Sequence, residues 1–402
     1  MWPIYLDNNA TTRADPAVVA AMLPYFSEQF GNASSAHAFG SEVAGAVKQA
    51  RKSLQALLGT ALDHEIVFTS GGTESDNTAI LSALDNQDGR DEIVTTAVEH
   101  PAILSLVERL GTLRGIKTHL IGVDSRGQLD IEAYRRALGP RTAIASAMWA
   151  NNETGTLFPV ERLAAMAHAA GALFHTDAVQ AIGKIPIDLK ATEIDMLSLS
   201  GHKLHAPKGI GALYVRKGAP FNPLIHGGPQ ERRRRGGTEN VPGIIGLGKA
   251  AELATARMVE ELPRVRAMRD RLEQGILSVG DCFMIGDGLN RLPNTSNVAF
   301  GYLDGEAIIH HLNRAGIAAS LGSACSSGSM QPSHVLLAMK VPMPALRGAV
   351  RFSMSHDNTD DDVDQVLHVL PDIIAGLRAS SPSWQERPRA APASPFRSKE
   401  LV

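Results

Sequence analysis

Cysteine is scarce in this chain of 402 residues, which contains only Cys282 and Cys325. So few thiols exclude a small scaffold held together by disulfides, and we expect both to be free in a reducing, cytoplasmic compartment. Each cysteine is then either a small residue that fills space in the structure or a residue with a chemical role.

The sequence also lacks long apolar runs and a strong charge of one sign. No run of about 18 apolar residues could span a bilayer. The N-terminal MWPIYLDNNATT has no basic segment followed by a long apolar run, so we expect no signal peptide. The formal net charge of -3 predicts no general attraction to nucleic acid or to a membrane surface. Small molecules and other proteins are the expected partners.

The length and the apolar content favour two domains. A single core usually stops growing at about 250–300 residues, and the hydrophobic fraction of 44% supplies enough material for two cores. We predict a large domain over 15–255 and a small domain formed by 1–14 and 256–380. The tail over 381–402 is rich in Pro, Ser and charge, which predicts disorder.

Seven β-branched runs alternate with helix-length segments between residues 65 and 218. This alternation predicts an α/β domain built on a mostly parallel seven-stranded sheet. Polar groups directly follow five of the runs, and such sheets usually bind ligands at the carboxyl ends of their strands. The expected strands are EIVFTS (65–70), EIVTTAV (92–98), KTHLIGV (117–123), RTAIASAMW (141–149), ALFHTDA (172–178), DMLSLS (195–200) and GALYVRKG (211–218).

Beyond this sheet we expect a long helix over about 246–279, a stretch rich in Ala, Leu, Glu and Arg. A second, smaller α/β unit follows it. The closing helix of that unit is expected to begin at Asn358 and Thr359. Three aspartates, 360 to 362, then fall in its first turn, where carboxylates interact favourably with the helix dipole.

The stretch SGGTES at 70–75 follows a predicted strand and opens a predicted helix. Backbone N–H groups at such a helix start, together with small side chains, form a good site for a phosphate. The spacing is not that of a Walker motif, and a simple capped helix start is an alternative explanation of the same residues.

Two charged residues stand at other strand ends. Asp177, in HTDAVQ, ends an apolar strand. Burying a carboxylate there costs free energy unless it pairs with a cation, such as a pyridinium nitrogen. The alternative is that Asp177 caps the next helix. Lys203, in SLSGHK, lies among small residues, where a partly desolvated lysine can form Schiff bases, although most lysines are surface charges. A phosphate site, a carboxylate and a lysine at neighbouring strand ends together indicate a pyridoxal phosphate site.

These motifs resemble those of class V, fold type I pyridoxal phosphate enzymes, and among them the cysteine desulfurases of the NifS/IscS kind. The resemblance spans nearly the whole chain, and the DNNATT and GGTENVPGI segments are closer to the nitrogen-fixation branch. The matching motifs are YLDNNATT (5–12), FGNASSAH (30–37), FTSGGTESDN (68–77), EH (99–100), NNETG (151–155), HTDAVQ (175–180), SLSGHK (198–203), APKGIGALYV (206–215), GGTENV (236–241), LGSACSSG (321–328) and RFS (351–353).

The resemblance implies a role for each residue of the site. Lys203 would hold the cofactor as a Schiff base, Asp177 would pair with the ring nitrogen, and His100 would stack on the ring and assist proton transfers. Arg351 would bind the substrate carboxylate as a bidentate partner, and Cys325 would be the nucleophile. The other implied contacts are Gly72, Thr73, Ser200 and His202 at the phosphate, Thr238 reaching it from the other subunit of a homodimer, Gln180 beside the ring, and Asn152 at both ring and substrate.

The implied reaction removes sulfur from L-cysteine and leaves L-alanine and a persulfide on Cys325. A thiolate must attack the substrate sulfur and then pass it on, and the glycines and serines of SLGSACSSGSM (320–330) predict a mobile loop that allows both steps. An iron–sulfur scaffold protein, serving nitrogenase, is the implied acceptor. No intrinsic metal is expected, and Cys325 would contact a cluster on the scaffold only transiently.

Two kinds of alternative stay open. A selenocysteine lyase or a class V aminotransferase would use the same cofactor without depending on Cys325, and a scaffold without cofactor would be no enzyme at all. A metal hydrolase is disfavoured, because the sequence contains no HExxH or CxxC pair.

Other features have simpler explanations. The run from Arg232 to Arg235 fits a solvated charged loop, although a basic surface near the phosphate or a docking patch for an acidic partner is the alternative. Cys282, within the apolar DCFMI, is expected to be a buried small hydrophobe rather than a second catalyst. His168, His310 and His311 are expected to be ordinary helix residues.

Overall fold

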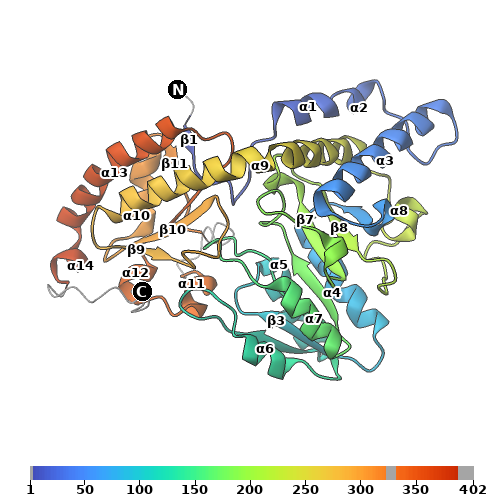
Figure 1. Cartoon of the computed structure of the whole chain (residues 1–402), viewed down its shortest axis with the longest axis horizontal. Helices are drawn as coiled ribbons and strands as arrows, with labels where there is room; N and C mark the ends of the chain where they lie inside the picture. Colours follow the sequence, from blue (N-terminus) through green and yellow to red (C-terminus); the bar gives the residue numbers. More distant parts are fainter. Residues whose placement is uncertain (1–2, 323–331, 388–402) are drawn as a thin grey trace.

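The structure is a computed structural model that describes residues 3–322 and 332–387. Two units lie side by side in Figure 1, and one long helix, α9 (Val241–Leu277), runs through both. The stretch 320–330 is described only as far as Gly322. The predicted mobile loop with Cys325 therefore lies outside the described residues, as does the chain beyond 387.

The large unit contains a seven-stranded sheet, and all seven predicted strands are present, which confirms the predicted fold class. They are β2 Ile66–Thr69, β3 Glu92–Thr96, β4 Lys117–Ile121, β5 Thr142–Ser146, β6 Leu173–Asp177, β7 Met196–Ser200 and β8 Gly211–Val215. The order is β2-β8-β7-β6-β5-β3-β4, and β8 runs antiparallel to both neighbours. Residues 201–210 alone join β7 to β8, which is too short for the crossover that a parallel neighbour requires.

Helices cover both faces of this sheet. Val67 packs in one core cluster with Ile80 and Val107, whereas the adjacent Phe68 packs on the opposite face with Leu54 and Leu163. This alternation gives the unit three layers. Its helices are α1 Pro16–Met22, α2 Pro24–Ser27, α3 Ala38–Leu58, α4 Gly72–Asn86, α5 Pro101–Arg114, α6 Ile131–Ala137, α7 Val160–Ala169 and α8 Gln230–Arg233, with 3-10 turns η1 Asp63–Glu65, η2 Leu189–Ala191 and η3 Gly201–Lys203.

The smaller unit has a three-stranded antiparallel sheet with β10 in the centre, and its N-terminal strand pairs in parallel with a distant one. The three strands are β9 Cys282–Ile285, β10 Thr295–Phe300 and β12 Ala349–Ser353, and the parallel pair is β1 Ile4–Tyr5 with β11 Ile317–Ala318. Helices α10 Gly305–Arg314, α11 His334–Ala338, α12 Met343–Leu346, α13 Asp360–Ser380 and α14 Pro382–Gln385 complete it. Residues from the N-terminus, α9 and α13 share its core. The exact domain boundaries stay a prediction.

Local capping explains where the two longest predicted helices of the C-terminal half begin. Helix α9 starts at Val241, five residues before the predicted start, because the Asn240 side chain accepts a hydrogen bond from the Gly243 N–H. Helix α13 starts as predicted, since Thr359 and Asp362 cap each other's backbone N–H groups. Among the described helices, none is both long and apolar enough to cross a membrane.

The structure differs from the predicted disorder at the start of the tail. The Ser381 hydroxyl accepts a hydrogen bond from Trp384 N–H and opens α14. The Trp384 ring then lies between two guanidinium groups, with Arg378 4.2 Å and Arg387 3.4 Å from its centroid. These cation–π contacts give an otherwise polar segment a reason to fold back on α13.

We predict that Glu273→Gln lowers the free energy of unfolding by about 3–5 kcal/mol. Glu273 and Arg291 form a buried bidentate pair at 2.6 and 2.7 Å, so the variant leaves the buried guanidinium with only the more distant carboxylate of Asp270, 3.9 Å away. Urea unfolding measures the change. The exposed pair of Glu132 and Arg135 provides the control, because Glu132→Gln should cost less than about 0.5 kcal/mol. Equal effects of the two variants would contradict this account.

Candidate functional site

A cavity of about 610 Å³ opens at the carboxyl ends of the large sheet's strands. Its walls come from loops that follow β2, β3, β5, β6 and β7, from the N-terminal segment and from the small unit. The structure therefore brings together ten of the residues that the sequence singled out. These are Gly72, Thr73, His100, Asn152, Asp177, Gln180, Ser200, His202, Lys203 and Arg351.

The start of helix α4 forms one wall of this cavity. Its N-cap residue is Gly71, and no side chain among the described residues caps it, so backbone N–H groups face the cavity. A Cβ on Gly72 would come within 2.9 Å of Val179, which explains the glycine there. Ser200 and His202 line the same wall. This wall suits a phosphate because it offers backbone N–H donors and the positive end of the helix dipole, and because no side chain caps the helix start.

His202 adds a neutral donor to this wall. Burial, and then the charge of Lys203, lower the pKa of His202 to about 4. The imidazole is therefore uncharged at neutral pH and holds Thr11 through Nδ1 at 3.1 Å.

Two buried carboxyl groups, those of Asp177 and Asp76, also line the cavity. Asp177 ends β6 and accepts a hydrogen bond from Val179 N–H at 2.8 Å. Burial raises the pKa of Asp177, while the charges of His100 and Lys203 oppose that rise. Asp76, on α4, is 1% exposed; burial and the nearby Asp177 raise its pKa well above the usual value. A cation placed against Asp177 would offset the cost of ionising it.

Lys203 lies at the end of η3 and is tied to the N-terminal segment. Its Nζ donates to the carbonyl oxygens of Asn9 and Ala10, both at 2.6 Å. Gln180 Nε2 donates to the same Asn9 carbonyl at 2.9 Å. Residues 7 to 12 thus cross from the small unit to the large one directly over the lysine.

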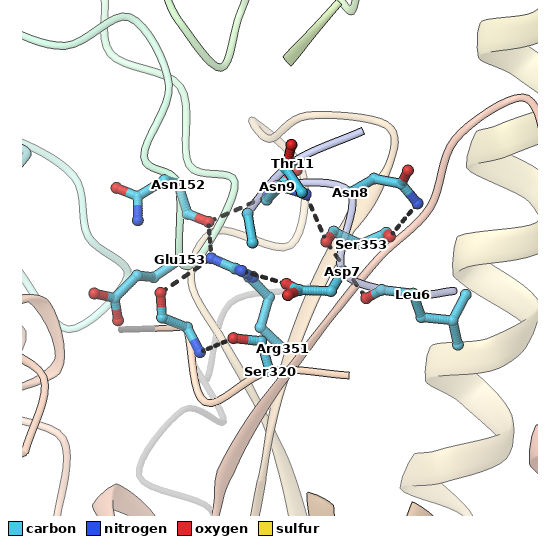
Figure 2. Close-up of polar contacts among 12 residues, drawn as sticks. Leu6, Asp7, Asn8, Asn9, Thr11, Asn152, Glu153, Ser320, Arg351 and Ser353 are labelled. Carbon is cyan, nitrogen blue, oxygen red and sulfur yellow. Dashed lines mark hydrogen bonds and ion pairs between the residues drawn. The ribbon is translucent and has the colours of Figure 1, made fainter. Parts of the chain in front are cut away.

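Arg351 anchors that segment from the other side, as Figure 2 shows. It is 1% exposed on β12, and its Nη2 pairs with Asp7 at 2.7 Å. Its Nη1 donates to the carbonyl oxygens of Asn152 and Gly322, each at 3.0 Å. The guanidinium therefore already holds one carboxylate, that of Asp7, within the chain itself.

Two of the predicted site residues are not part of this cavity. Thr238 is exposed and does not line it within a single chain, and Cys325 lies outside the described residues. Gly322, three positions before Cys325, is nevertheless in the cavity wall.

The arginine run is only partly the solvated loop that we expected. Arg232 and Arg233 are exposed, but Arg235 pairs with Glu74 in the first turn of α4 at 3.0 Å. Arg234 is half-buried and donates to the His64 carbonyl, and burial lowers its pKa to about 10. Half of the run thus makes contacts within the chain, and Arg235 braces the first turn of α4.

The second cysteine is poorly suited to nucleophilic chemistry. Cys282 opens β9 and is half-buried rather than buried, and desolvation raises its pKa to about 11. It stays a thiol at neutral pH. The predicted helix histidines are indeed on helices, His168 on α7 and the adjacent His310 and His311 on α10, although His168 also binds Asp195 at 2.7 Å.

The sequence motifs contained several of these partners without revealing their roles. Asp7 and Asn9 lie in DNNATT, Asp76 in SGGTESDN and Glu99 in the EH pair. Burial raises the pKa of Glu99 to about 8, so this carboxyl group is mostly protonated at neutral pH. Nothing in AIGKIP indicates that Lys184 belongs to the surroundings of the site. Only their contacts across the fold identify these residues.

A polar cluster beside the cavity joins the two units. His205, His356 and Asp357 have ligand atoms within 4.8 Å of one another, a grouping that could hold a metal ion. However, Arg257 Nη1 donates to His356 Nε2 at 3.1 Å, so a positive charge faces the lone pair that a metal would need. The two imidazole rings, 4.2 Å apart, act here as a contact between the units.

Comparison with known proteins decides the family. A family model described as Aminotransferase class-V matches residues 4–366. The chain belongs to the class-V aminotransferase family.

Members similar to this class-V chain include a cysteine desulfurase of Gluconacetobacter diazotrophicus, 70% identical over 95% of this chain and 96% of the relative. Cysteine desulfurase NifS of Azotobacter vinelandii is 58% identical over 96% of each chain. A solved NifS-like protein matches with a TM-score of 0.87 at 38% identity, covering 93% of this chain and 100% of the other. The predicted NifS-like resemblance and the fold of these pyridoxal phosphate enzymes are thus confirmed.

The residues present fit the cofactor that this class-V family implies. An uncapped helix start is suited to a phosphate, a buried carboxyl group is suited to a ring cation, and a lysine lines the same cavity.

We predict that Asp76→Asn stabilises the chain more at about pH 8 than at about pH 5. The folded pKa of Asp76 is raised above its unfolded value of about 4. The folded state therefore keeps a proton that the unfolded chain releases, and stability falls as the pH rises from about 4 toward the folded pKa. The amide of the variant does not titrate, so this loss of stability at higher pH does not occur.

Urea unfolding without added cofactor at the two pH values measures this effect. The control is Asp85→Asn, an exposed position on the same helix, which should shift stability by less than about 0.5 kcal/mol at both. The charge account is wrong if Asp76→Asn destabilises the chain equally at both pH values.

Proposed function

We propose that this chain is an L-cysteine desulfurase. It would convert L-cysteine and its own Cys325 thiol into L-alanine and a Cys325 persulfide, so that the substrate's C–S bond breaks and an S–S bond forms. The observation that carries the proposal is the single cavity in which Lys203, Asp177, an uncapped helix start and Arg351 meet. The names of the similar proteins support cysteine as the substrate.

Pyridoxal phosphate, when bound, supplies an electron-withdrawing ring that weakens bonds at the α-carbon of an amino acid. Lys203 would hold its aldehyde, and Asp177 would hold its ring nitrogen. Gly72, Thr73, Ser200 and His202 would bind its phosphate. Asn152 and Gln180 would contact the oxygen side of the ring. His100, which accepts a hydrogen bond from Ala102 N–H through Nδ1, would stack on the ring and move protons with Lys203.

Substrate orientation is assigned to Arg351. Its planar guanidinium can bind a carboxylate through two hydrogen bonds, and Asp7 shows a carboxylate on one edge of it. Asn152, whose carbonyl binds the same group, would contact the substrate through its side chain.

Sulfur transfer is assigned to Cys325. The raised pKa of Cys282 leaves that thiol protonated, whereas the Cys325 stretch continues directly from Gly322 in the cavity wall. The persulfide would then pass to an iron–sulfur scaffold protein, and the 58% identity with a protein named NifS favours nitrogenase as the destination.

A homodimer would complete the site. Thr238 is exposed and does not line the cavity of its own chain. It is therefore available to reach the phosphate of a second copy, as the family resemblance implies.

We predict that Lys203→Ala abolishes the visible absorbance band that pyridoxal phosphate gives with the purified chain, because Lys203 is the lysine that would hold its aldehyde. Absorbance spectra after cofactor addition and desalting measure the loss. Lys217→Ala, at an exposed position, should retain the band. A scaffold without cofactor would show no band in any of the three proteins.

We predict that Cys325→Ala lowers alanine formation from cysteine at least about 100-fold, while Cys282→Ala leaves it within about twofold. Mass spectrometry of the unmodified chain after incubation with cysteine should find one added sulfur on the peptide that contains Cys325. Full activity of Cys325→Ala would instead favour a selenocysteine lyase or an aminotransferase, and added sulfur on another peptide would remove the carrier role.

A further inference from the structure

Lys184 is a second lysine beside the cavity, and no step of the proposed reaction uses it. It follows β6 in the turn after Gln180 and lines a separate cavity of about 90 Å³, whose wall it shares with Lys203. Burial lowers the pKa of Lys184 to about 7, and the charges of Lys203 and Arg351 act in the same direction. A lysine kept in such a place is costly unless it makes a useful contact.

The contact that Lys184 makes is with a predicted cofactor residue. Its Nζ donates to Gln180 Oε1 at 2.9 Å, and Gln180 Nε2 donates to the Asn9 carbonyl at 2.9 Å. The same carbonyl accepts a hydrogen bond from Lys203 Nζ at 2.6 Å. A continuous chain of hydrogen bonds therefore joins the two lysines through one amide and one carbonyl.

This chain of contacts fixes which end of the Gln180 amide faces which neighbour. When it is protonated, Lys184 can only donate, and a backbone carbonyl can only accept at any pH. Reversing the amide would place its NH₂ against Lys184 and its oxygen against the Asn9 carbonyl, so both contacts would become repulsive. The observed orientation keeps the NH₂ group on the cavity side, where Gln180 lines the wall.

We propose that Lys184 is a positioning residue that holds the Gln180 amide with its N–H donors toward the Asn9 carbonyl and the cavity, where the ring oxygen of the cofactor would lie. This inference deepens the proposed function and rests on it. It gives Lys184 a task in tuning the bound cofactor without contact to substrate, to cofactor or to the reacting atoms.

The test follows the visible absorbance band of the holoenzyme as a function of pH. In Lys184→Met the amide is no longer held, and the negative ring oxygen loses a donor. The cofactor–lysine linkage then keeps its proton more readily, so the midpoint of the titration should rise by about one pH unit. The kcat for cysteine should fall about tenfold with KM within about twofold, because Arg351 is untouched.

Three further variants separate positioning from packing and from simple charge. Lys184→Arg keeps a donor, and the neighbouring cavity has room for it, so the midpoint should stay within about 0.3 pH units of the wild type. Lys190→Met, at an exposed position, should change nothing. In a Gln180→Ala background, Lys184→Met should add no further shift, because its effect runs through that amide.

The outcomes are distinct. An unchanged midpoint in Lys184→Met overturns the inference, as does an equal shift in the Gln180→Ala background, which would make Lys184 only a nearby charge. A wild-type chain that shows no band, or forms no alanine from cysteine, overturns the proposed function and this inference with it.

Discussion

The buried guanidinium of Arg351 is the contact on which the rest of the site depends. It gathers the Asp7 carboxylate and two backbone carbonyls, those of Asn152 and Gly322, from three separate segments. A buried cation without such partners would be strongly destabilising. The N-terminal segment is therefore held at a definite place, and its carbonyls at Asn9 and Ala10 in turn hold Lys203.

Burial decides the charges around this framework. Asp76 and Glu99 are pushed toward their neutral forms, and His202 is kept uncharged by the same desolvation. Asp177 has cationic neighbours that oppose the rise in its pKa. The result is a cavity that combines neutral carboxyl and imidazole groups with the cations Lys203, Lys208 and Arg351. A charged ligand would thus meet a preorganised electrostatic environment.

Much of the fold and of the site could be read from the sequence, because the informative residues are local. Five of the seven β-branched runs end directly before a polar motif, so strand ends and candidate residues are found together, as with Asp177 and Lys203. The direction of β8 depends on the short 201–210 connection rather than on composition. Asp7, Asp76 and Lys184 were missed as partners because their roles depend on contacts with residues that come together only in the fold. The ordered segment around Trp384 likewise depends on contacts with flanking arginines. Judged by composition alone, such charged residues predict disorder.

Helix α9 has a mechanical consequence. Its 37 residues give it a length of about 55 Å, and it packs into the cores of both units. Pro263 lies inside it and cannot donate to the carbonyl of Val259, whose residue is 83% exposed, so water can serve that oxygen. The helix bends most easily at this point. The stretches of α9 that enter the two cores thus lie on opposite sides of Pro263, so the weakest point of the helix separates the packing of the large unit from that of the small one.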